Sequence, residues 1–264
     1  MNLLSPALRG AMVYEFRMAA RRKVLWIAIL PLLAIATLIC FTSARVSELD
    51  TVSGKAGAWA VLVNIFIGVG LGVGLADRFV RTHRFGLAEV LAATPTGLGT
   101  RMLGVLCGSV AAGLVPVAAV LVVVMPLSLR QPSAIPTGMF WGLVALLIAI
   151  LPAVLLITMI SATAGLVMPV PLARVLAVLL WFWSTIFSAS IVPLPTPTGT
   201  LLSPLGDYVA VGWLQGPVLW AGRGVPELLS PPATALTATL NLFVILALTA
   251  VLFGVARSAA ARRS

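Results

Sequence analysis

Six long stretches of apolar residues, separated by short polar segments, dominate the pattern along the chain. A bilayer core about 30 Å thick is crossed by roughly 20 apolar residues in a helix. The apolar residues run continuously and do not alternate with polar ones, and an open sheet would leave backbone groups unpaired in lipid, so helices are predicted. The predicted spans are Val24 to Thr42, Ala58 to Ala76, Met102 to Leu129, Met139 to Ile160, Val175 to Val192 and Leu236 to Val255.

Small and cyclic residues inside the spans predict how the helices bend and pack. Four prolines inside the spans are expected to kink their helices, and groups on neighbouring helices then bond the carbonyls that the kinks free. They are Pro31, Pro116, Pro126 and Pro152. Two overlapping pairs of glycines spaced four residues apart, Gly68 with Gly72 and Gly70 with Gly74, lie near the end of the second span. Such small-xxx-small pairs permit close contact between helices. Tight packing without a role in a transport path is the simpler interpretation of these glycines.

Composition agrees with this class, because 61% of the 264 residues are hydrophobic, only 9% are charged and the mean hydropathy is +1.13. A soluble domain carries roughly a quarter charged residues. The net charge of +10 does not indicate nucleic acid, since the basic residues stand between apolar runs and not on a polar, stacking surface. We therefore predict an all-α integral membrane protein of six transmembrane helices.

The distribution of basic residues predicts the orientation. If the N-terminus is cytoplasmic, the outer segments hold Arg45, Lys55, Arg130 and Arg223, and the inner segments hold the other 13 of the 17 Lys and Arg residues. The positive-inside rule favours this arrangement, with the protein multi-pass in the plasma (inner) membrane and both termini cytoplasmic. Residues 1 to 44 resemble a signal peptide in outline, but the apolar run is too long and five more spans follow, so a retained first span is predicted.

Catalytic and energy-coupling groups are missing from the predicted spans. They contain no charged residue and no His, and their only carboxamides are Asn64 and Asn241, so ion-driven transport is disfavoured. His83 is the single His, and no carboxylates pair at the spacing of a metal site or an acid-base dyad. Neither Cys40 nor Cys107 has a partner at metal-ligand spacing, and no disulfide between them is expected.

A nucleotide loop is also missing, because the nearest fragment, Ser53 to Ala56, lacks both the first Gly and the hydroxyl after Lys. We therefore expect no catalytic residues, no metal and no cofactor bound by this chain.

The N-terminal segment, residues 6 to 23, is predicted to form an amphipathic helix. Leu8, Met12, Phe16 and Ala20 recur on one face, while the remaining face is rich in basic residues. Such a helix lies in the membrane interface with its basic side toward lipid phosphates. A simple basic topogenic segment is the alternative.

The predicted inner loop between spans two and three, residues 77 to 101, contains a second amphipathic element. Leu87, Val90 and Leu91 fall on one face of a short helix that Gly86 precedes and Thr94-Pro95 ends. A short, mostly apolar helix on a basic, polar stem is suited to a groove in another protein.

With this loop, the six-span layout and the N-terminal helix, the chain resembles the permease subunits of ABC-2-type transporters. Their loop typically carries a Gly-x-x-Glu-x-Leu-x-x-(Thr/Ser)-Pro core, which Gly86 to Pro95 matches. Many relatives have Gly-Lys at the start of span three, where this chain has Gly104-Val105, and this weakens the subfamily assignment.

The resemblance implies that residues 1 to 23 form an "elbow" helix and that Phe85 to Pro95 form a coupling helix that docks on an ATP-binding subunit, with Glu89 as its polar contact. The implied coupling residues are Phe85, Gly86, Leu87, Glu89, Val90, Leu91, Thr94 and Pro95. It places Glu15, Arg17 and Arg21 near that interface. The implied partners are two ATP-binding subunits, which carry ATP and Mg, and a second copy of this permease or a similar one.

The outer segment, residues 193 to 235, is rich in Pro and Gly. The resemblance implies short re-entrant helices that cap the pathway, whereas the residues themselves favour an interfacial segment anchored by Tyr208, Trp213 and Trp220. The division expected is residues 1 to 23 as elbow and 24 to 264 as transmembrane domain, with a cytoplasmic tail at 257 to 264.

The function expected from this reading is ATP-driven export of an apolar or amphipathic substrate such as a drug, lipid or peptide. The alternatives are a facilitator for uncharged solutes, a structural subunit of a membrane complex and, least favoured, an intramembrane enzyme.

Overall fold

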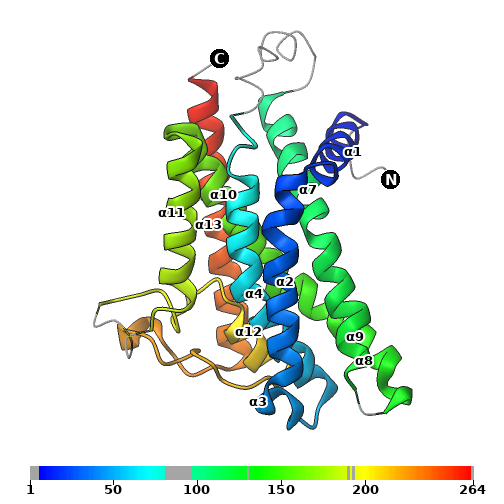
Figure 1. Ribbon diagram of the computed structural model, residues 1–264. Coiled ribbons are helices and arrows are strands. Elements are labelled where there is room, and N and C mark those ends of the chain that lie inside the picture. Colours follow the sequence, from blue (N-terminus) through cyan, green and yellow to red (C-terminus); the bar gives the residue numbers. More distant parts are fainter. Residues whose placement is uncertain (1–5, 81–96, 130, 189–190, 192–193, 263–264) are drawn as a thin grey trace.

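The computed structural model describes residues 6–80, 97–129, 131–188, 191 and 194–262. Within these ranges every regular element is helical, and no strand occurs. The long helices run side by side as one bundle, and the two ends of the chain lie at the same end of it (Figure 1). The all-α fold class predicted from hydropathy is confirmed for this part of the chain.

Five continuous helical segments are long and apolar enough to cross a membrane. Three of them are single α-helices: α2 (Lys23–Thr42), α4 (Val52–Leu75) and α13 (Ala235–Ala261). The segment Leu98–Leu127 consists of α7 (Leu98–Ala119), a π-helical turn (Val120–Val124) and α8 (Met125–Leu127). The segment Pro132–Val167 consists of a 3-10 turn (Pro132–Ala134), α9 (Ile135–Ala145), a second π-helical turn (Leu146–Ile150) and α10 (Leu151–Val167). Five of the six predicted spans are therefore confirmed as elements, although each is longer than expected. The shorter elements are α1 (Pro6–Ala20), α3 (Ala44–Ser47), α11 (Val170–Thr185), α12 (Asp207–Gly212) and a 3-10 turn (Glu227–Leu229).

The fifth predicted span, Val175 to Val192, corresponds to α11, which begins earlier and ends at Thr185 after 16 residues. At about 1.5 Å per residue it is shorter than the roughly 20-residue length of a full crossing. Its last turn is closed by residues from the following segment: Thr198 Oγ1 donates to Trp183 O and Ser203 Oγ donates to Ser184 O. The expected helical end near Val192 is wrong because distant hydroxyls cap the free carbonyls of the last turn.

Prolines explain the two π-helical turns. Pro126 follows the turn Val120–Val124, and Pro152 follows the turn Leu146–Ile150. A proline lacks an N–H and its ring clashes with the carbonyl four residues before it, and a wider turn accommodates both effects. Pro31 and Pro116 instead lie within α-helical stretches.

Helix α4 forms the centre of the bundle, with 72% of its most apolar window buried compared with 22% for α13. Its glycines allow close contact with several neighbours. A Cβ on Gly68 would collide with the Trp181 ring of α11, whereas one on Gly70 would lie 2.8 Å from Ala28 O of α2. The predicted use of these glycines for close helix contact is confirmed.

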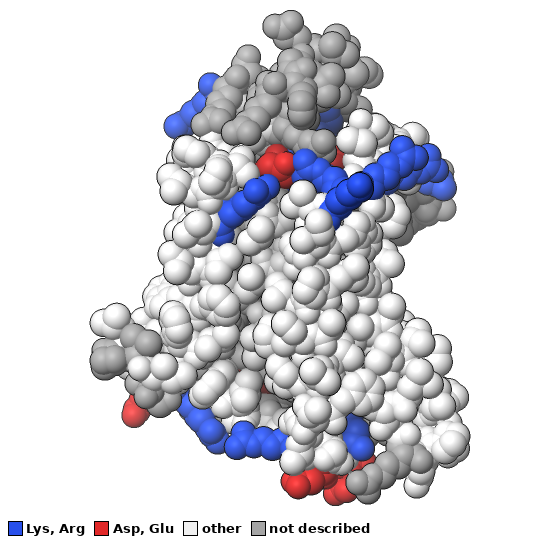
Figure 2. Space-filling view, viewed as in Figure 1, with Lys and Arg blue, Asp and Glu red and all other residues white. Residues whose placement is uncertain are grey.

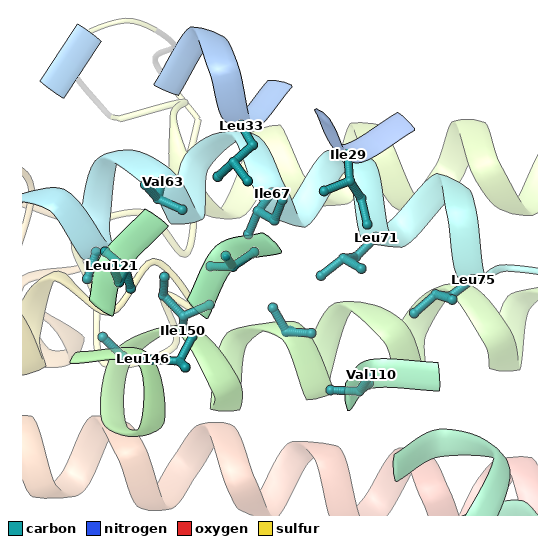
Figure 3. Close-up of a cluster of buried hydrophobic side chains, with 14 of the residues drawn as sticks. Ile29, Leu33, Val63, Ile67, Leu71, Leu75, Val110, Leu121, Leu146 and Ile150 are labelled. Atoms are coloured by element: carbon teal, nitrogen blue, oxygen red, sulfur yellow. The ribbon is translucent and has the colours of Figure 1, made fainter. Parts of the chain in front are cut away.

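Aliphatic side chains from several helices interlock around α4 (Figure 3). In lipid this packing stabilises the bundle mainly through dispersion contacts, because lipid tails are as apolar as the core itself. The labelled residues are Ile29, Leu33, Val63, Ile67, Leu71, Leu75, Val110, Leu121, Leu146 and Ile150. Cys40 is also buried and Cys107 is half-buried, and both are free thiols.

Among the described residues, the charged side chains of the long helices stand near the helix ends. Figure 2 shows two bands of charged side chains on the visible face, with a belt of uncharged residues between them. The belt carries exposed apolar side chains such as Ile27, Leu38, Leu179 and Phe243. This distribution supports a multi-pass membrane protein, since a soluble protein rarely exposes so large an apolar surface.

Candidate functional site

The predicted coupling helix, Phe85 to Pro95, lies outside the described residues, as does His83. This includes all eight expected coupling positions: Phe85, Gly86, Leu87, Glu89, Val90, Leu91, Thr94 and Pro95. The described elements nearest to it in the sequence are the end of α4 and the beginning of α7, against which α2 and α1 pack.

Helix α1 lies across α7 at the end of the bundle where both termini are found (Figure 1). Two glycines of α7 make this close crossing possible. A Cβ on Gly104 would stand 2.5 Å from Ala11 Cβ, and a Cβ on Gly108 would collide with Met12 O. Because the helix backbones approach here without intervening side chains, α1 is held closely against the bundle.

The face of α1 that packs inward matches the expected apolar face only in part. Leu8, Met12 and Ala20 are half-buried as expected, whereas Phe16 is exposed and Ala19 is buried. The glycines of α7 bring the backbone at Met12 close, and this contact sets which side of α1 faces the bundle. The helix is present as predicted, but its orientation is set by α7.

Two ion pairs, which we call the charged clamp (Glu15, Arg22, Asp77 and Arg78), join the N-terminal helices to the end of α4. Arg22 Nη1 and Nη2 donate to Asp77 Oδ1 and Oδ2 at 2.8 and 2.7 Å. The adjacent Arg78 Nη1 donates to Glu15 Oε2 at 3.5 Å. Hydrogen bonding to Asp77, opposed by burial, raises the pKa of Arg22. Asp77 and Arg78 are adjacent and oppositely charged, and each binds a side chain whose charge is opposite to its own. The two pairs together fix how the N-terminal helices align with the end of α4.

Of the three expected elbow-interface residues, only Glu15 takes part in the charged clamp, where the Arg78 side chain it meets is 2% exposed. Arg17 and Arg21 are exposed near the C-terminal end of α1. Sequence reasoning did not single out Arg22, Asp77 or Arg78 as a paired set. The signal available was the Asp-Arg dipeptide that follows the second span, but its partners lie 55 and 63 positions away.

At the opposite end of the bundle, residues 194 to 234 form what we call the capping segment. Both carboxamides of the spans bind its backbone. Asn64 Nδ2 of α4 donates to Leu205 O at 2.8 Å and Asn241 Nδ2 of α13 donates to Leu201 O at 2.8 Å. Each makes a second bond, to Pro204 O at 3.2 Å and Ser203 O at 3.0 Å. These amides therefore hold a non-helical backbone that could not otherwise be buried beside the spans.

Tyr208 connects separate parts of the capping segment to one another. Its hydroxyl donates to Gly199 O at 3.1 Å or Pro231 O at 3.0 Å, and accepts from the amide of Gly222 at 3.0 Å. The side chain is fully buried, so it does not serve as the interfacial anchor expected from its type. Trp213 Nε1 donates to Ala235 O at the start of α13, which ties the segment to the last span.

The segment enters the bundle beside a π-helical turn. Gly206 has φ +81°, a backbone conformation that glycine adopts at low cost, and a Cβ there would stand 3.1 Å from Ala149 Cβ. A small recess next to it is lined by Ile148, Pro152, Val209 and Ile245, together with Asn241. The recess has a volume of only about 10 Å³, roughly the room that one water molecule needs, so it is a small gap in the packing and not a substrate site.

No group of three or more His, Cys, Asp or Glu side chains that could hold a metal ion occurs among the described residues. Searches against protein-family models and curated proteins find no match for this chain. The charged clamp links α1 and the start of α2 to the end of α4, and the capping segment is hydrogen-bonded to α4 and α13 at the opposite end of the bundle.

Proposed function

We propose that this chain is the membrane-spanning permease subunit of an ATP-driven exporter of the ABC-2 type. The observation that carries the proposal is the charged clamp. Arg22 and Glu15 bind Asp77 and Arg78, the first two residues of the loop whose later part resembles a coupling helix. A force applied to that loop by another subunit would reach α1, α2 and α4 together, because ion pairs and close backbone contacts link them.

In this proposal the charged clamp and both termini face the cytoplasm, where the excess of basic residues favours them. Six crossings would result if α11 spans together with the residues that follow it. Energy enters from two separate ATP-binding subunits, since the sequence has no nucleotide loop. Their closure would move the coupling helix and α1, and the bundle would switch between two packed arrangements.

The proposed substrate is apolar or amphipathic, such as a drug, lipid or peptide. The predicted spans carry no charged side chain, so no fixed charge would compensate an ionic group inside the membrane. A second copy of this chain, or a similar permease, would complete the path.

The test is purification of the tagged full-length chain from its native membrane, with mass spectrometry of the co-purifying proteins and an ATPase assay. An associated subunit with a Walker A motif is expected. The double variant Glu89→Gln/Leu91→Ala is expected to lose it, whereas Glu48→Gln/Leu228→Ala, which changes the same residue types at the other end, is expected to retain it. A pure chain without ATPase, or equal retention by both variants, would favour a facilitator or a structural subunit.

A further inference from the structure

The capping segment holds a carboxyl group in a position unusual for a structural residue. Asp207 is fully buried at the start of α12. The amide of Tyr208 donates to its Oδ1 at 3.1 Å, but Oδ2 is buried with no hydrogen-bond partner. A buried carboxylate is normally fully hydrogen-bonded or paired with a cation, because an unsatisfied charge away from water is costly.

The surroundings of Asp207 do not supply a compensating charge in contact with it. The ionisable side chains on the elements around it are Lys55 at the start of α4, and Tyr208, Arg223 and Glu227 within the capping segment. None of these forms an ion pair with Asp207 in the described structure. The π-helical turn and the adjoining half of α13 carry no ionisable residue in their sequence.

Asp207 also occupies a point where several parts of the capping segment meet. Helix α12 packs against α4, α13 and the π-helical turn Leu146–Ile150. The next residue, Tyr208, joins three backbone groups from distant parts of the segment. Water that hydrated the carboxylate would have to enter between these contacts, so ionisation and closure compete.

We propose that Asp207 makes the capping segment a proton-operated latch, which is closed when the carboxyl is neutral and loosened when it is charged. This inference goes beyond the proposed function and does not depend on it, because the latch would act in any protein that uses this segment to close the bundle. The ligand of the latch is a proton. When Asp207 is charged, it favours the loosened state of the segment, in which water reaches the carboxylate.

The direction follows from proton linkage. Burial raises the pKa of Asp207 from 3.8 to about 6, although the nearby amides of Tyr208, Trp220 and Ala221 favour the charged form. The closed segment thus binds the proton more tightly than an open, hydrated one. The stability that proton binding adds to the closed segment is fully present below pH 3.8 and is lost as the pH rises through about 6.

Hydrogen exchange of the full-length chain in lipid nanodiscs tests this directly. After correction for the intrinsic pH dependence of exchange, amides of residues 206 to 222 are expected to be about tenfold better protected at pH 5 than at pH 7.5. In Asp207→Asn this difference is expected to vanish, whereas Glu227→Gln, which removes an exposed carboxylate from the same segment, is expected to keep it. Unchanged pH dependence in Asp207→Asn would overturn the proposal.

An infrared titration of the wild-type protein provides an assay that does not require the variant to fold. The band of a protonated, buried carboxyl group is expected to disappear with a midpoint near pH 6. A midpoint near 4, or the absence of a buried carboxyl band at pH 5, would also overturn the latch.

Discussion

Arg22 and Asp77 face each other across the junction of α2 and α4, and both Nη atoms of the guanidinium donate to the carboxylate, at 2.8 and 2.7 Å. The side chains are 23% and 19% exposed, so water screens the pair only in part. A two-bonded contact of this kind is stronger and more directional than a single ion pair at a surface.

Reversing the charge at Arg22 is expected to destabilise the protein. Arg22→Asp places two carboxylates together, and a loss of about 1–3 kcal/mol is expected. Thermal unfolding in detergent measures it. The double variant Arg22→Asp/Asp77→Arg is expected to recover part of the loss, and Arg21→Asp, the same change at the exposed neighbouring position, is expected to have little effect. Equal losses in Arg22→Asp and Arg21→Asp would mean that the pair is unimportant.

Adding one methyl group at Gly68 is expected to separate α4 from α11. The new Cβ would overlap the Trp181 ring, whose Nε1 donates to Ile65 O at 2.8 Å. Overpacking of this kind costs about 1–3 kcal/mol. The matched control is Gly254→Ala on α13, where nothing lies within 4 Å. That variant is expected to be neutral or slightly stabilised, because alanine favours helix more than glycine does.

Removing either buried carboxamide is expected to loosen the capping segment. Asn241→Leu leaves Leu201 O and Ser203 O without their donor, and each buried unpaired carbonyl costs about 1–3 kcal/mol. Limited proteolysis between residues 194 and 234 measures the effect as faster cleavage. Thr239→Ala, an exposed change on the same helix, should cleave at the wild-type rate. Asn64→Leu should behave like Asn241→Leu, and resistance in both would contradict the anchoring role.

The hydroxyl group of Tyr208 is expected to stabilise the capping segment through its hydrogen bonds, beyond what the packing of the ring contributes. Tyr208→Phe keeps the packing but removes the hydroxyl contacts to Gly199 O, Pro231 O and the Gly222 amide. The Gly222 amide still donates to Gly199 O at 3.1 Å, so the expected loss of about 1–3 kcal/mol arises mainly from Pro231 O, which is left without this partner. Hydrogen exchange at Gly222 should report it as faster exchange than in the wild type. Slow exchange there would indicate that other groups hold the segment.

Hydropathy predicted most of the fold because crossing a membrane is a local requirement. A stretch such as Leu236 to Val255 must be helical wherever its neighbours lie, since its own backbone satisfies its polar groups. The same reasoning failed at the end of α11, where Thr198 and Ser203 cap the last carbonyls from outside the helix. An apolar sequence that could have continued as helix therefore stops at Thr185.

By itself, then, the sequence determined the helical class, five of the spans, the N-terminal helix and the absence of charge from the predicted spans. These properties depend on residues close together in the chain. Only the tertiary structure decided that Asn64 and Asn241 hold the capping segment, that Tyr208 is buried and that Glu15 meets Arg78. Their partners lie between 9 and 141 positions away, and which polar group meets which is set by how the helices pack.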